Sequence, residues 1–191
     1  MTKEQRIEAF KREAPQMILD NEEFMSFLKN EGFFDSPAST KYHGVYDGGL
    51  FDHSAVVHLE LKNLTKCLNL EWQRPESVFI IGMFHDICKH DQYIKAPGTS
   101  ITFPDGKEVV SNEGFHYEYN GNTLLKGHGA KSVMILSRFI TLTEEEQLCI
   151  RYHMGAYETN EWAEFDKAIK KYPNVFYTHT ADMIASKIDN V

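Results

Sequence analysis

Four histidines and two aspartates of this chain occupy positions where a helix is predicted to begin, end or pack against apolar neighbours. Imidazole and carboxylate side chains suit first-row metals such as iron, manganese, cobalt and zinc. Helices that pack around one core can direct such side chains at a common centre. We therefore expect a metal site whose ligands are His53, His85, Asp86, His128, His153 and Asp182.

The pair His85 and Asp86 lies inside the apolar stretch "GMFHDICKH" (82–90). Neighbouring residues leave a helix about 100° apart, so both can serve one metal only if it sits close to the helix surface. A carboxylate can bridge two cations and an imidazole cannot, which makes Asp86 the natural bridge. Two metals roughly 3.5–4 Å apart can activate a water and clamp a phosphoryl oxygen. The simpler alternatives are a buried pair that only stabilises the core, and a single-metal site in which His128 and His153 bond main-chain carbonyls.

The order of these residues resembles the HD-domain superfamily of metal-dependent phosphohydrolases, in the branch with two extra histidines before the last aspartate. The segments that carry the resemblance are "GGLFDHSAVVH", "FHDICKH", "GHGAKSVMIL", "IRYHMG" and "TADMIAS", within about residues 40 to 190. The resemblance implies a divalent transition metal, two per chain, drawn from Fe, Mn, Co, Ni or Zn. It assigns one metal to His53, His85, Asp86 and Asp182. It assigns the other to Asp86, His128 and His153.

Several cationic side chains are candidates for contacting a substrate. Lys89 follows His85 by four residues and Asp86 by three, so it shares their helix face, and the resemblance assigns it a substrate phosphate. Its alternative is a solvated cation at a helix end. Lys131 and Arg151 lie on the predicted helices of His128 and His153, and we expect them to bind substrate. We also expect His116 to bind substrate. The group that protonates the leaving group is open: it could be His116, His43 or a water.

The segments that carry these residues are predicted to be helices, and one predicted β segment interrupts their series. We expect an all-α HD-domain helical bundle, one domain over residues 1–191, with N-terminal helices over 1–35. Thr2 with Gln5, and Thr143 with Glu146, are predicted capping boxes, and Asp52 is a predicted cap for a helix over 53–70. Turn signals at Pro-Asp-Gly and Asn-Gly predict a small β-hairpin insertion over about 98–124.

Composition restricts the partners. The net charge of −8 disfavours long nucleic acid, because binders of that kind are usually basic. The polar N-terminus and the lack of a long apolar run predict a cytoplasmic protein without a membrane span. The three scattered cysteines predict neither a zinc knuckle nor a disulfide framework.

The sequence thus predicts a metal-dependent phosphohydrolase that cleaves a small phosphorylated substrate, with a nucleotide as the first choice. Asp86 and Lys89 are the predicted catalytic residues. Two rivals remain open: a di-iron oxygenase of the same fold, and a catalytically silent nucleotide-binding module. The ligands alone do not separate the hydrolase from the oxygenase.

Overall fold

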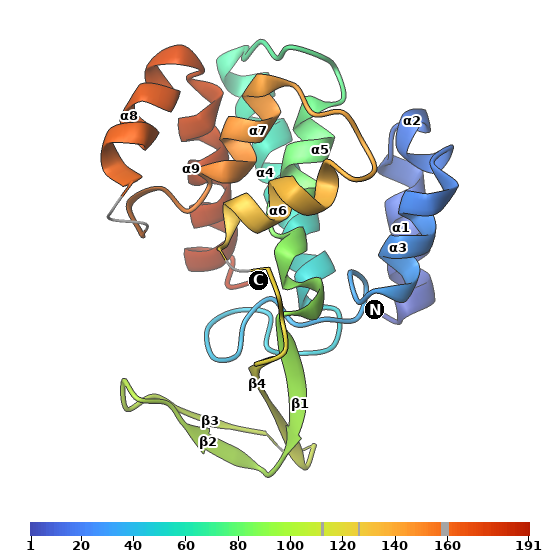
Figure 1. The fold of residues 1–191 in the computed structure, drawn as a ribbon, viewed down its shortest axis with the longest axis vertical. Helices are drawn as coiled ribbons and strands as arrows, with labels where there is room; N and C mark the ends of the chain where they lie inside the picture. Colours follow the sequence, from blue (N-terminus) through green and yellow to red (C-terminus); the bar gives the residue numbers. More distant parts are fainter. Residues whose placement is uncertain (112, 126, 158–160) are drawn as a thin grey trace.

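The computed structural model describes residues 1–111, 113–125, 127–157 and 161–191, so position 112 of the predicted β insertion lies outside the described residues. Helices form the body, and two small antiparallel sheets project from one end of it (Figure 1). The α-helices are α1 (Lys3–Glu13), α2 (Gln16–Leu19), α3 (Glu22–Asn30), α4 (Gly49–Leu68), α5 (Ser77–Phe84), α6 (Gly129–Leu136), α7 (Glu144–Arg151), α8 (Trp162–Lys171) and α9 (Asn174–Lys187). The 3₁₀ helices are η1 (Ile87–Asp91) and η2 (Gly155–Tyr157). The strands are β1 (Tyr93–Pro97), β2 (Ser100–Thr102), β3 (Glu108–Val110) and β4 (Phe115–Tyr119). The prediction of a mainly helical fold with a small β insertion is confirmed.

The N-terminal helices pack on the body through aromatic side chains. Thr2 and Gln5 form the predicted capping box, which starts α1 by satisfying main-chain N–H groups. Phe10 of α1 then meets four other rings edge-on or tilted, at centroid distances of 5.5 to 6.4 Å. Edge-to-face contacts at such distances stabilise a core beyond the area they bury. The rings that surround Phe10 are Phe33, Phe34, Phe79 and Phe84.

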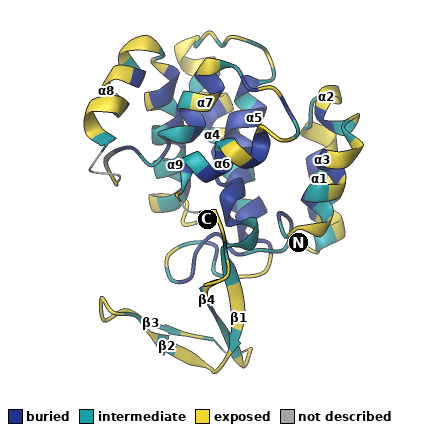
Figure 2. Cartoon of the chain, viewed as in Figure 1, coloured by how far each residue is buried: buried dark blue, intermediate teal, exposed yellow. Residues whose placement is uncertain are grey.

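The body is built around α4, which packs against both α5 and α9. Helix α7 packs against α5 and α9, and α6 packs against α7 and η1. Figure 2 shows α5 buried over most of its length, while the strands are mostly exposed or half-buried. A Cβ on Gly82 of α5 would lie 2.5 Å from the Cα of His58 in α4, so only glycine allows this approach.

Helix α4 begins earlier than expected. The prediction that Asp52 caps a helix starting at residue 53 is wrong: the cap is Gly48, with φ of 85°, and α4 starts at Gly49. Asp52 lies in the first turn, where it accepts two hydrogen bonds from Arg6 of α1, of 2.9 and 2.8 Å. The carboxylate is used to join two helices, and this long-range pairing was not visible in the local pattern.

The β insertion also begins earlier than expected. Strands β1 and β4 pair antiparallel from Tyr93 with Tyr119 to Pro97 with Phe115, so the β region spans 93–119 rather than about 98–124. The Pro-Asp-Gly turn does connect β2 and β3. The Asn-Gly turn instead follows β4, whose partner β1 precedes it in sequence, and among the described residues 120–125 no strand returns.

The insertion is fixed to the loop that precedes α4. Tyr117 of β4 donates a hydrogen bond of 2.7 Å to Asp47, and the Lys95 ammonium of β1 lies 2.6 Å from the same carboxylate. Figure 1 shows this loop between the helical body and the strands. The loop and the insertion therefore lie together at one end of the molecule.

Candidate metal centre

The six predicted ligands converge from five segments of the body. α4 supplies His53 one turn after its start, the α5–η1 junction supplies His85 and Asp86, and α9 supplies Asp182. His128 and His153 come from the N-terminus of α6 and the residues that follow α7. The capping box of Thr143 and Glu146 starts α7 as predicted.

Asp86 is the centre of the cluster, and its two carboxylate oxygens face different histidines. Oδ2 lies 3.7 Å from Nε2 of His53 and 3.6 Å from Nε2 of His85. Oδ1 lies 2.6 Å from Nε2 of His128 and 3.3 Å from Nε2 of His153. This division matches the one expected of a carboxylate that bridges two cations.

Asp182 completes the Oδ2 side. Its Oδ1 lies 3.2 Å from Nε2 of His53 and 3.9 Å from Nε2 of His85, and the two Nε2 atoms are 3.3 Å apart. The group His53, His85 and Asp86 is compact enough to hold one metal ion. The Nε2 atoms of both histidines point toward Asp86 because the Nδ1 atoms bond main-chain oxygens.

Main-chain oxygens orient three of the four imidazoles. In each ring Nδ1 bonds a carbonyl, which leaves the Nε2 lone pair directed at the centre, the arrangement usual for metal-binding histidines. The pairs are His53 with Val191 (2.8 Å), His85 with Gly82 (2.9 Å) and His153 with Ile150 (2.7 Å).

An unpaired buried nitrogen supports a metal on the Oδ1 side. Among the residues that the structure describes, Nε2 of His153 is buried without a hydrogen-bond partner, whereas Oδ1 of Asp86 and Nε2 of His128 lie 2.6 Å apart as an ion pair. Leaving such a nitrogen unpaired costs about 1–3 kcal/mol, which a coordinated cation would offset. The donor set therefore fits a first-row metal on both sides of Asp86.

In the protein without metal, burial and the neighbouring charges together set the pKa values of the cluster residues. Burial opposes charge on Asp86, but the Lys89 ammonium and the surrounding histidines outweigh it and hold the pKa of Asp86 well below its usual range. Burial similarly disfavours a charged His128, yet Cys88 and Asp86 outweigh it and raise the pKa of His128 to about 10. At His85 burial prevails, and the pKa falls to about 3. Without metal, the cluster keeps its carboxylate ionised and at least one imidazole neutral.

Lys89 lies against Asp86, as its sequence position predicted. Its ammonium is 2.7 Å from Oδ2 of Asp86, and the residue is only 6% exposed. Asp86, Lys89, His128 and Asp182 all line one cavity of about 480 Å³. The solvated helix-end alternative for Lys89 is therefore wrong.

His43 is a cavity residue beside the cluster. Its ring lies 4.8 Å from that of His53, and neither ring nitrogen has a hydrogen-bond partner among the described residues. Burial is the main cause that lowers the pKa of His43 to about 4. The ring is therefore neutral near pH 7.

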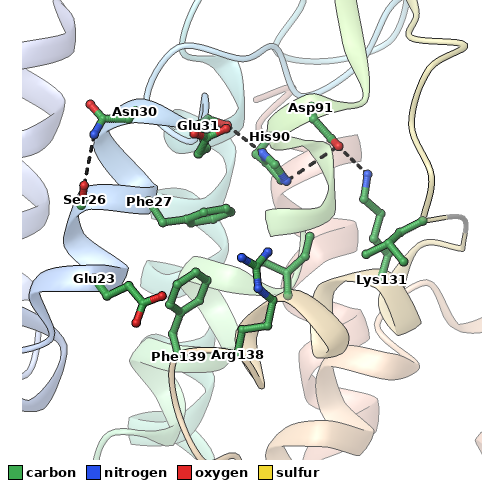
Figure 3. Close-up of a pocket in the computed structure, with 12 residues that line it drawn as sticks. Glu23, Ser26, Phe27, Asn30, Glu31, His90, Asp91, Lys131, Arg138 and Phe139 are labelled. Atoms are coloured by element: carbon green, nitrogen blue, oxygen red, sulfur yellow. Dashed lines mark hydrogen bonds and ion pairs between the residues drawn. The ribbon is translucent and has the colours of Figure 1, made fainter.

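The structure does not bring the other three predicted substrate residues to this cavity. Lys131 bonds Asp91 and lines a separate cavity of about 500 Å³, and Figure 3 shows its ammonium directed at that carboxylate. Arg151 bonds Glu161. His116 lies on β4 with Nδ1 at 3.4 Å from the Gly98 carbonyl, beside a third cavity.

Cys88 is a site residue that sequence reasoning missed. Its buried sulfur lies 4.0 Å from Nδ1 of His128, the ring nitrogen that carbonyls occupy in the other three histidines. Asp86, Cys88 and His128 also form a group compact enough to hold a metal ion. Without a Cys-x-x-Cys spacing, only its position two residues after Asp86 could have indicated this contact.

None of the described helices is both long and apolar enough to cross a membrane. Comparisons with protein-family models, with curated proteins and with solved structures found no match to this chain.

Proposed function

We propose that this chain is a metal-dependent phosphohydrolase of the HD-domain type, acting on a small phosphorylated substrate such as a nucleotide. One observation carries the proposal: Asp86 presents one oxygen to His53 and His85 and the other to His128 and His153, with Lys89 beside it. The order of these residues in sequence supports it independently.

In this proposal His53, His85, Asp86 and Asp182 hold one metal, and Asp86, His128 and His153 hold the second. The metals supply a water of lowered pKa and positive charge for the phosphoryl oxygens. Charged groups that are already in place before the reaction stabilise the transition state most strongly, because they need not reorganise as negative charge develops on the phosphoryl oxygens.

The residues that line the cavity have separate tasks. Lys89 places a fixed ammonium beside the bridge and offsets charge on the substrate phosphate. Neutral His43 is placed beside the cluster, where its ring nitrogens can hold a water or a substrate hydroxyl by a hydrogen bond.

A nucleotide is the preferred substrate because aromatic rings line the same cavity. Tyr93 and Tyr119 both line it, and their ring centroids are 5.3 Å apart. Bases stack on such side chains with little dependence on base identity.

The test starts with metal content, measured by plasma mass spectrometry on protein purified without added metal. We expect about two metals per chain, about one in His153→Ala and almost none in Asp86→Ala. A panel of nucleotide monoesters, diesters and dinucleotides follows. If no substrate is cleaved by metal-loaded protein, the hydrolase proposal is wrong.

The same samples distinguish the rivals. Oxygen consumption by the iron form, lost with manganese, would identify an oxygenase. Tight nucleotide binding with no turnover under any metal would identify a silent binding module.

A further inference from the structure

Three lysines surround one exposed tyrosine at the outer part of the cavity. The ammonium groups of Lys107, Lys41 and Lys187 lie 4.5, 5.2 and 5.9 Å from the ring centroid of Tyr42. They come from the β2–β3 turn, the loop before α4 and the last residue of α9. Three distant segments thus bring positive charge to one place.

This positive charge is only partly balanced. Lys41 lies 2.5 Å from Asp105, which also accepts a hydrogen bond of 3.5 Å from Tyr42. Across the part of the chain that the structure describes, neither Lys107 nor Lys187 makes a carboxylate ion pair. Because like charges repel one another, an anion bound here would be favoured, even on a chain of net charge −8.

Two of the three lysines line the same cavity as the candidate metal centre, and Lys107 joins them at the ring of Tyr42. Lys41, Tyr42 and Lys187 line it together with Asp86 and Lys89. A ligand with one phosphate beside Lys89 could therefore extend toward Tyr42 without leaving the cavity.

We propose that Lys41, Lys107 and Lys187 form a second anion subsite, and that the substrate carries a second phosphate group bound there. The inference rests on the proposed function for what happens at Lys89, and it adds the substrate class: phosphate esters with two separated phosphates. Phosphate accepts charge-assisted hydrogen bonds from lysine as a compact anion, which suits ammonium groups gathered from flexible side chains.

The test compares two probes by calorimetry, adenosine 3′,5′-bisphosphate and adenosine 5′-monophosphate. We expect the bisphosphate to bind about tenfold more tightly to the unaltered protein. In the double variant Lys107→Gln/Lys187→Gln this advantage should fall close to one. The matched control is Lys62→Gln/Lys170→Gln, which removes two exposed lysines elsewhere and should keep the full advantage.

Equal affinity of both probes for the unaltered protein would overturn the subsite, as would an equal loss of the advantage in the control. The substituted side chains at 107 and 187 are exposed, so their loss should leave the unfolding midpoint in urea unchanged. Lysine-dependent binding without any hydrolysis would support the subsite and refute the hydrolase. Hydrolysis of both probes with equal KM, unaffected by the double variant, would support the hydrolase and refute the subsite.

Discussion

Replacing Lys89 by methionine tests whether the cluster is built for added positive charge. Methionine keeps the approximate length of the side chain but removes the ammonium 2.7 Å from Oδ2 of Asp86. Both side chains are almost fully buried, at 8% and 3% exposure. Burial alone would lower the pKa of Lys89, but Asp86 outweighs burial and the net shift is upward. The pair is therefore charged in the metal-free protein.

The distance sets the expected magnitude. At 2.7 Å the attraction is about 6 kcal/mol for an effective dielectric constant of about 20, and desolvation of the ammonium offsets part of it. Removing one member of a buried pair costs about 3–5 kcal/mol. His128 remains 2.6 Å from the other oxygen, so we expect the lower end, about 3 kcal/mol. For a chain of this size that corresponds to a fall in Tm of roughly 6–12 °C.

The assay is thermal unfolding of Lys89→Met and the unaltered protein, each with chelator and each with excess manganese. Cations beside Asp86 would replace the lost charge, so the stability difference should shrink to about 1 kcal/mol with metal. Lys170→Met, at an exposed ion pair, should change Tm little in either condition. An equal deficit with and without metal would refute the reasoning, because the cluster would then gain no positive charge.

Three further predictions concern the stability of the helices that carry the site. Arg6→Ala removes both hydrogen bonds to Asp52 and should cost about 3 kcal/mol in urea unfolding, whereas Lys62→Ala, at an exposed pair, should cost under about 0.5 kcal/mol. Gly82→Ala forces a Cβ against the main chain of His58 and should destabilise the protein by about 2–3 kcal/mol, read from the same denaturation curves. Burial lowers the pKa of His58, so the unfolded chain binds its proton more readily and stability should fall as pH drops from about 7.5 to about 5.5. His58→Leu should reduce that pH dependence; an unchanged slope would contradict the assignment.

Local signals in the sequence were sufficient for some helix ends and for the choice of side chains that the structure brings together around Asp86. The capping boxes at Thr2 and Thr143 depend on residues three positions apart, and both formed as predicted. The six predicted ligands were chosen from their positions at helix ends and from the resemblance in their order, and helices that share a core can bring such side chains together. Their geometry around Asp86 is what such packing predicts.

Long-range pairing explains what the sequence did not indicate. Asp52 reads locally as a cap, but Arg6 lies 46 residues away and binds it. Lys131 reads as a neighbour of His128, yet Asp91 of η1 binds its ammonium away from the cavity. The partner of β4 likewise precedes it by about 20 residues, which displaced the expected insertion. In each case the deciding contact joins segments with no shared local pattern.

The atoms that hold the four imidazole rings on their Nδ1 side differ in how easily a substitution can remove them. A carbonyl oxygen belongs to every amino acid, so no single replacement at Gly82, Ile150 or Val191 deletes the atom that orients a histidine. Cys88 differs, since its sulfur is a side-chain atom beside His128. Random mutation can therefore retune the His128 side of the centre in one step, while the orientation of the other three rings is protected by the backbone itself.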